Sequence, residues 1–259
     1  MTTTSSPGTF YGRGFAEFYD RYGTGWTRDF APLLAQWLSG RPGAEERLVL
    51  DLACGTGVSA QILLRAGWDV IGLDISAGML ANAAHRLAQD VETGRVVLQQ
   101  AEMTTFVLDR QVRACVALEG ALNHLLSEEA LEQCFARVAA VLPVGGTFVF
   151  DLYEPHHFRG WHNIGVTDEP DAVIVKRGVW DEERGIGMLR FSGLFDDGSG
   201  PIRVDQTVTS RAYGADVLNA LLSKAGLDPE PYPAEVPACA CGRSRSGSCR
   251  TVYAATKAA

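Results

Sequence analysis

The chain has 259 residues, 46% of them hydrophobic, and a formal net charge of −8. This length and apolar content allow a large core with an insertion, and the acidic balance argues against nucleic acid as the main partner, because phosphate binding needs a basic face. No run approaches the ~20 apolar residues of a membrane span, and residues 1–8 lack the features of a signal peptide. We therefore expect a cytoplasmic protein with no membrane partner.

The first 44 residues are expected to form a lid segment and a helix. Residues 1–14 read as a flexible lead-in, and the chain becomes helical from Phe15. Apolar residues then repeat at helical spacing behind Thr27, the expected N-cap, as far as a Gly/Pro break at 40–43. These apolar residues are Phe30, Leu33, Leu34, Trp37 and Leu38.

Residues 45–152 alternate between short apolar runs and amphipathic helices. The helices cover 58–66 and the segments that begin after two capping serines, Ser76 and Ser127. Nearly continuous apolar strands separated by helices predict a parallel sheet covered on both faces, so the expected fold is α/β, doubly wound and Rossmann-like. The strands are expected at 48–52, 70–73, 96–100, 114–118 and 147–152.

The pattern changes after the fifth of these strands. Within residues 153–210, three runs at 173–180, 186–195 and 202–209 predict an antiparallel meander, inserted as a cap over the substrate. Residues 211–259 return to the α/β core with a helix at 215–225 and a final strand at 251–255.

The strand at 48–52 ends in an acid and runs into a glycine turn. Gly55-x-Gly57-x-x-Ala60 satisfies a dinucleotide fingerprint, but Asp51 would repel a pyrophosphate at the following helix N-terminus. S-adenosylmethionine has no phosphate and carries a sulfonium and an ammonium that an acid attracts. Asp74, at the end of the next strand, is placed to accept both ribose hydroxyls. The residues favour S-adenosylmethionine, with an NAD-dependent oxidoreductase as the alternative.

The motif Asp51-x-x-Cys54-Gly55-Thr56-Gly57, followed by Asp74-Ile75-Ser76-x-x-Met79-Leu80, resembles the class I S-adenosylmethionine-dependent methyltransferases over residues 45–152. The resemblance implies a seven-stranded sheet whose last strand is antiparallel. It also implies that Ile75 and Met79 lie near adenine. Core packing is the alternative for both, and it suits Met79 equally well. Contacts with the cofactor are expected from Tyr19, Asp51, Ala53, Cys54, Gly55, Gly57, Asp74, Ile75, Met79, Ala101, Glu102, Met103, Leu118, Glu119 and Gly120.

The end of the third strand departs from the family pattern, in which an acid there binds the adenine amino group. Gln100-Ala101-Glu102-Met103 occupies this place. Ala101 offers only backbone groups, so Glu102 is the candidate for the adenine contact and Met103 for stacking on the base.

The turn after the fourth strand, Leu118 to His124, is expected to face the transferred methyl group, because ligands of parallel sheets bind at the carboxyl ends of strands. It resembles the turn of small-molecule amine methyltransferases, such as the glycine and amino-sugar N-methyltransferases. His124 is the candidate catalytic residue, as a base or as an orienting group. The alternative is a histidine hydrogen-bonded within the turn. Asn123 is a candidate for substrate binding.

Aromatic residues also mark two other segments. Phe15 to Trp26 resembles the lid helix of the same enzymes, with Tyr19 or Tyr22 as candidate ligands of the cofactor's carboxylate, Tyr22 being assigned to the substrate side. Tyr153 and Trp161 are expected at the rim of the substrate pocket, with Trp180, Phe191 and Phe195 as further wall candidates. The alternative for these rings is the core of the meander or docking of the lid helix.

The histidines and the last cysteines predict no metal site. His156, His157 and His162 have no acidic or thiol partner at ligand spacing, and methyl transfer needs no metal. Cys239, Cys241 and Cys249 lie in a Gly/Ser/Arg-rich loop that we interpret as solvated.

Together these patterns predict transfer of a methyl group from S-adenosylmethionine to an amine or hydroxyl of a small-molecule metabolite, of a specialised pathway, by direct in-line displacement. The alternatives are the NAD-dependent oxidoreductase and a protein that binds S-adenosylmethionine without catalysis. The patterns leave the oligomeric state open.

Overall fold

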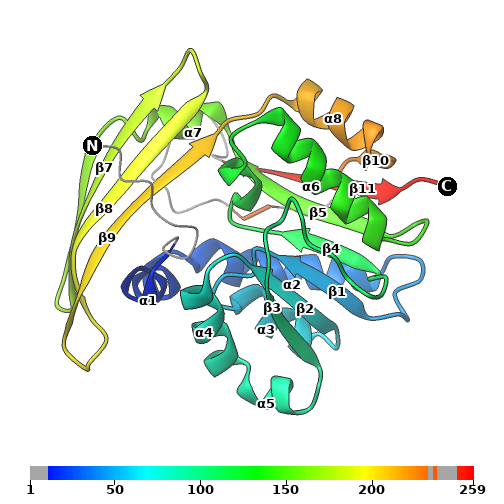
Figure 1. The fold of residues 1–259 in the computed structure, drawn as a ribbon, viewed down its shortest axis with the longest axis horizontal. Helices are drawn as coiled ribbons and strands as arrows, with labels where there is room; N and C mark the ends of the chain where they lie inside the picture. Colours follow the sequence, from blue (N-terminus) through cyan, green and yellow to red (C-terminus); the bar gives the residue numbers. More distant parts are fainter. Residues whose placement is uncertain (1–10, 233–235, 238–249) are drawn as a thin grey trace.

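The computed structural model describes residues 11–232, 236–237 and 250–259, which contain two separate sheets (Figure 1). The larger sheet has seven strands in the order β10-β11-β5-β4-β1-β2-β3. Their bounds are β1 (Leu48–Leu52), β2 (Asp69–Asp74), β3 (Val96–Gln100), β4 (Ala114–Ala117), β5 (Thr147–Tyr153), β10 (Leu227–Glu230) and β11 (Arg250–Lys257).

Strands β1 to β5 pair in parallel, and β11 runs antiparallel between β5 and β10. The expected doubly wound sheet with an antiparallel last strand is therefore confirmed. Strand β10 was not expected from its residues, because Leu227-Asp228-Pro229-Glu230 lacks an apolar run. It forms at the edge of the sheet, where a proline does not interrupt a hydrogen-bonded ladder on both sides.

Helices cover both faces of this sheet, which explains the continuous apolar strands. Successive strand residues face opposite ways: Leu50 packs in the core beneath α6 and α8, whereas Val49 packs in the core beneath α2 and α3. Figure 1 shows α6 and α8 on one side of the sheet and α2, α3 and α4 on the other. The bounds are α2 (Gly25–Ser39), α3 (Val58–Arg65), α4 (Ala77–Arg86), α5 (Ala88–Glu92), α6 (Glu128–Val141) and α8 (Ala215–Lys224).

Two of the three expected helix caps are confirmed. The Ser76 hydroxyl accepts a hydrogen bond from the Met79 amide, and the Ser127 hydroxyl accepts one from the Ala130 amide. The Thr27 cap was wrong, because α2 already begins at Gly25 and its N-cap is Thr24. The lead-in expected to reach residue 14 is also shorter, since helix α1 (Arg13–Tyr22) begins before Phe15.

The second sheet contains four antiparallel strands rather than the three expected. The added strand is β6, which follows the short helix α7 (Pro155–Arg159). Its sequence has too few apolar residues to predict a strand. The inner face of this sheet packs on α1, where Phe15 and Phe18 join a buried cluster with Val204. Figure 1 places α1 between this sheet and α4. The bounds are β6 (Ile164–Glu169), β7 (Ala172–Asp181), β8 (Ile186–Asp196) and β9 (Pro201–Arg211).

No helix within the described ranges is both long and apolar enough to cross a membrane.

Candidate active site

A pocket of about 200 Å³ lies where the carboxyl ends of β1, β2 and β4 meet α1 and the inner face of the second sheet. Sequence-predicted residues that line it come from five segments of the chain. They are Tyr19, Asp51, Ala53, Cys54, Gly55, Asp74, Met79, Leu118, Glu119, Gly120, His124, Tyr153 and Trp161.

An adjacent cavity of about 220 Å³ lies at the ends of β2 and β3. It is lined by the remaining residues predicted near adenine, which are Ile75, Ala101, Glu102 and Met103. Tyr11 and His124 line both cavities, so they stand at the boundary between them. The Glu102 carboxylate accepts a hydrogen bond from the Thr104 hydroxyl, which orients it in this cavity.

Three of the predicted residues do not line either cavity. Gly57 is the N-cap of α3, and a Cβ on it would meet Leu87 and Ala83 at 3.1–3.2 Å, so its role is close packing with positive φ. Tyr22 is 38% exposed and donates its hydroxyl hydrogen to Asp171. Asn123 is fully buried.

Asn123 holds the turn after β4 against its neighbours. Its amide nitrogen donates to the Arg211 carbonyl at 2.8 Å, and its amide oxygen accepts from the Tyr153 backbone N–H at 2.9 Å. Because the side chain has no exposed surface, its contacts are with the protein itself. They fix the turn that carries His124 between β5 and β9.

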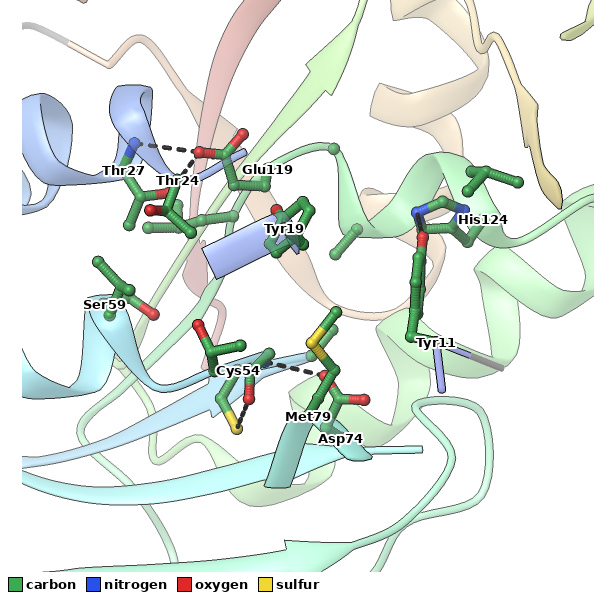
Figure 2. A pocket seen from close by; sticks show the side chains of 18 of the residues that line it. Tyr11, Tyr19, Thr24, Thr27, Cys54, Ser59, Asp74, Met79, Glu119 and His124 are labelled. Atoms are coloured by element: carbon green, nitrogen blue, oxygen red, sulfur yellow. Dashed lines mark hydrogen bonds between the residues drawn. The ribbon is translucent and has the colours of Figure 1, made fainter. Parts of the chain in front are cut away.

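Asp74 links the two ends of the predicted cofactor motif. One carboxylate oxygen accepts from the Gly55 backbone N–H at 2.9 Å (Figure 2). The other accepts from the Ser76 backbone N–H at 2.8 Å. Burial raises the pKa of this carboxyl, and these hydrogen bonds oppose the shift. Each oxygen keeps further acceptor capacity, so the same side chain can shape the glycine turn and bind two hydroxyls.

Asp51 is almost completely buried beneath the glycine turn. The Ser59 hydroxyl donates to one of its carboxylate oxygens at 2.5 Å. Burial raises the pKa of Asp51 to about 7, and the charge of Asp74 adds to the shift. The site therefore holds two buried acids that a cationic ligand would stabilise in their charged forms.

His124 lies in a short 3-10 helix, Ala121–His124, and bonds through both ring nitrogens. Nδ1 lies 3.2 Å from the Thr209 carbonyl oxygen, and Nε2 lies 3.2 Å from the Tyr11 hydroxyl. A carbonyl oxygen only accepts hydrogen bonds, so Nδ1 carries the hydrogen and Nε2 is the acceptor in the neutral ring. Burial lowers the pKa of His124, which favours this neutral form. Figure 2 shows the two side chains pointing toward one another.

Arg250, at the start of β11, joins a buried charge cluster beneath the pocket. One terminal nitrogen donates to Asp151 at 2.7 Å, and the other donates to Glu119 at 2.7 Å and to the Tyr153 hydroxyl at 2.6 Å. The guanidinium also lies over the rings of Trp26 and Tyr153. These contacts hold Glu119 and Tyr153 in place at the pocket wall.

The turn after β4 carries backbone strain. Glu119 has a φ of +62°, unusual for a residue with a side chain, and its carboxylate also accepts hydrogen bonds from the Thr27 amide and hydroxyl. The next residue, Gly120, has a φ of +66°, and a Cβ on it would meet the Tyr153 ring at 2.5 Å. Such strain persists only where surrounding contacts over-determine it, as they do here.

The lid helix is tied to the glycine turn by Asp20. Its carboxylate accepts two hydrogen bonds from Arg86 of α4 at 2.6 Å and one from the Thr56 hydroxyl at 2.5 Å. Arg86 also donates to the Thr56 carbonyl. Tyr19, one residue earlier, lines the pocket, and its pKa is raised by burial and by the charge of Glu119.

Several residues that line or support the pocket were not predicted in these places. Tyr11 was counted in the flexible lead-in, Thr27 was assigned as a cap, Arg250 was counted in the loop interpreted as solvated, and Asp20 and Ser59 were not singled out as site residues. Of the aromatic wall candidates, Trp161 and Phe191 line the pocket. Trp180 instead stacks on Phe158, and Phe195 packs with the lid helix.

The residues that were considered as metal ligands are the histidines after β5 and the last three cysteines. Within the described part of the chain, no group of three His, Cys, Asp or Glu side chains is arranged to hold a metal. His157 instead accepts a hydrogen bond from the Trp161 indole. Cys239, Cys241 and Cys249 lie outside the described residues.

The sequence matches a methyltransferase domain model over residues 49–146. A curated relative, the dTDP-3-amino-3,6-dideoxy-alpha-D-glucopyranose N,N-dimethyltransferase of Streptomyces fradiae, is 31% identical over 181 residues, which are 68% of each chain. These matches favour methyl transfer over the hydride transfer that the glycine pattern alone allowed.

Solved structures share the fold along nearly the whole chain. The CcbJ methyltransferase from Streptomyces caelestis has a TM-score of 0.77 at 23% identity, covering 98% of this chain and 100% of its own. An amino pentose methyltransferase from Micromonospora echinaspora, solved with S-adenosylmethionine bound, has a TM-score of 0.70 at 22% identity and covers 96% and 98%. The chain therefore belongs to the class I S-adenosylmethionine-dependent methyltransferases, in the group that acts on small molecules.

Proposed function

We propose that this methyltransferase acts on the amino group of a compact amino sugar. The observation that carries the proposal is the neutral His124 ring, whose Nε2 is an acceptor at the edge of the pocket. Once the Tyr11 hydroxyl that donates to it is displaced or shares it, this nitrogen can accept a hydrogen bond from an amine N–H and leave the amine lone pair free to attack. A ring nitrogen that carried a hydrogen would occupy that lone pair instead.

The cavity arrangement supports one orientation of the cofactor. Asp74 and the cavity with Glu102 suit the ribose and the base, whereas Asp51 and Tyr19 suit the charged amino-acid end. When bound, S-adenosylmethionine supplies an electrophilic methyl group on its sulfonium. The protein then has to align the amine with this group, and alignment alone can lower a barrier by several kcal/mol, up to about 7–11 kcal/mol.

The acceptor end of the pocket supports a compact and partly apolar substrate. Tyr153, Trp161 and Phe191 form its walls together with Leu189 and Val208 of the second sheet. Apolar walls with a few polar groups are typical of small-molecule sites. The Streptomyces fradiae relative is named for N,N-dimethylation of a dTDP-linked amino sugar, which makes this substrate class the first to test.

The test is a methylation assay with isotope-labelled S-adenosylmethionine and mass spectrometry of the products. The panel holds free and nucleotide-linked amino sugars, the same sugars with a hydroxyl in place of the amine, and glycine. We expect one or two methyl groups on the amino sugars and none on the hydroxyl analogues. Methylation of the hydroxyl analogues or of glycine in preference would contradict the proposal, as would binding of S-adenosylhomocysteine with no turnover on any member.

A further inference from the structure

One serine interrupts the apolar wall that the second sheet contributes to the pocket. Alternate residues of β9 face inward, so Val208 and Ser210 both line the pocket. The Ser210 side chain is buried, and within the described part of the chain its hydroxyl has no hydrogen-bond partner. A hydroxyl that is shielded from water costs free energy unless a partner bonds it. Because Ser210 lines the pocket, a bound acceptor can supply this partner.

The backbone on both sides of Ser210 is fixed to the turn that carries His124. The Thr209 carbonyl oxygen lies 3.2 Å from Nδ1 of His124. The Arg211 carbonyl accepts a hydrogen bond from the Asn123 side-chain amide at 2.8 Å. Both carbonyls bond the same turn, whereas the Ser210 side chain between them lies on the inner face of the sheet. The hydroxyl is therefore held beside the ring that is proposed to bind the acceptor amine.

Trp161 supplies a flat apolar surface next to the same hydroxyl. Ser210 pairs with Gly187 of β8, and a Cβ on Gly187 would meet the Trp161 ring at 3.1 Å. The glycine thus lets the indole lie against the sheet, one strand away from Ser210. Since both side chains line the pocket, its acceptor end offers an apolar plane with a ring nitrogen and a hydroxyl at its border. A sugar ring matches this arrangement, because C–H groups cover its faces and polar groups surround its edge.

We infer that Ser210 determines specificity by binding a ring hydroxyl on the carbon next to the one that bears the acceptor amine. The inference rests on the proposed function, because it takes the amine of an amino sugar to be held at His124. The neighbouring carbon follows from the chain, since Ser210 directly follows the residue whose carbonyl bonds that ring. A serine hydroxyl can donate or accept, so either direction of the hydrogen bond is possible. The bound hydroxyl does not react, so the contact should lower KM and leave kcat unchanged.

The test compares the steady-state kinetics of wild type and Ser210→Ala on an amino sugar and on two deoxy analogues, each lacking one hydroxyl beside the amine. On the full sugar, Ser210→Ala should raise KM about tenfold, the usual loss for one hydrogen bond. The wild-type enzyme should lose a similar factor on the analogue that lacks the bound hydroxyl. On this analogue the two enzymes should agree within about twofold, because the effects of two groups in contact are not additive.

The matched control is Ser192→Ala, the same substitution on the opposite face of the second sheet, where the Ser192 hydroxyl accepts from Arg177. It should have the wild-type KM on every sugar. If Ser210→Ala raises KM equally on the full sugar and on both analogues, or leaves KM unchanged on the full sugar, the inference is wrong and the proposed function stands. If the wild-type enzyme methylates no amino sugar, the proposed function fails and the inference fails with it.

Discussion

The Tyr11 hydroxyl lies 3.2 Å from Nε2 of His124, although 113 positions separate the two residues. Nδ1 of the same ring bonds the Thr209 carbonyl on β9. One imidazole thus joins the segment before the lid helix, the turn after β4 and the second sheet. Because Nε2 already accepts a hydrogen bond from the Tyr11 hydroxyl, a substrate amine that uses Nε2 must displace or share this hydroxyl.

Replacing His124 should slow methyl transfer with little effect on the binding of S-adenosylhomocysteine. We expect His124→Ala to lower kcat by about 10²-fold or more, the usual loss when a positioned acid–base group is removed. Tyr11→Phe, which removes only the hydroxyl partner of Nε2, should have a smaller effect. Turnover by His124→Ala at the wild-type rate would exclude the residue from the mechanism; steady-state kinetics and calorimetric titration make the distinction.

The protonation of His124 should also affect stability. Burial lowers its pKa below the usual 6.5, so the unfolded chain takes up a proton at a higher pH than the folded chain. The neutral ring makes its whole contribution to stability above a pH of about 6.5, the pKa of an unfolded histidine. This contribution is lost as the pH falls through the pKa of His124 in the folded protein. Urea denaturation from pH 7.5 to 5 should show a steeper loss for wild type than for His124→Gln, and parallel curves would contradict this assignment.

Asp51 should make cofactor binding pH-dependent. Its pKa in the free protein is about 7 against an ordinary 3.8, so much of it is protonated near neutral pH. A cationic cofactor favours the carboxylate. Affinity should therefore rise as the pH increases from 6 to 8, by at most about tenfold per pH unit, and binding should release a proton.

Calorimetry in two buffers of different ionisation enthalpy measures this proton release directly. Asp51→Asn is the control, because the amide keeps the size of the side chain and cannot ionise. It should bind S-adenosylmethionine more weakly and lose the Asp51 part of the pH slope. An unchanged slope in Asp51→Asn would mean that another group, such as Asp151 with its pKa of about 6, titrates instead.

The sequence predicted those parts of the site that local patterns encode. Asp51 and Asp74 lie at the ends of β1 and β2, and His124 lies in the turn after β4. The strand ends of a parallel sheet meet at one edge. Tyr11 and Arg250 could not be placed in the site in this way, because their partners lie 113 and 97 to 131 positions away and no local spacing marks them. The same reason applies to Thr27. A threonine near the start of a helix resembles an N-cap in the sequence, and only the structure shows that Thr27 donates to Glu119.

The Asp20–Arg86 pair should control how tightly the lid helix closes over the cofactor. Both side chains are largely buried, at 27% and 19% exposure, and charge-assisted hydrogen bonds of this kind contribute about 1.5–3 kcal/mol each. We expect Asp20→Asn to weaken S-adenosylhomocysteine binding by about tenfold or more. Asp29→Asn, an exposed acid on α2, is the control and should bind as wild type does. Equal affinities for the two variants would argue against a role in closure.

Arg250 should be essential for stability, because it neutralises two acids that are shielded from water. Its side chain is 2% exposed, and Asp151 and Glu119 are 0% and 14% exposed. Removing one partner of a buried ion pair typically costs about 3–5 kcal/mol, since the other charge is left without compensation. We therefore expect Arg250→Met to lower the free energy of unfolding by about this amount in urea denaturation at pH 7.5.

Two further variants separate lost charge compensation from lost packing. Adding Asp151→Asn to Arg250→Met removes one of the two acids that Arg250→Met leaves without a counter-charge. The double variant should therefore regain part of the lost stability. Arg159→Met breaks the exposed ion pair with Glu182, whose side chains are 61% and 67% exposed, and should change stability by less than about 1 kcal/mol. If the double variant is no more stable than Arg250→Met, the arginine stabilises the fold through its contacts with Trp26 and Tyr153 and not through the acids.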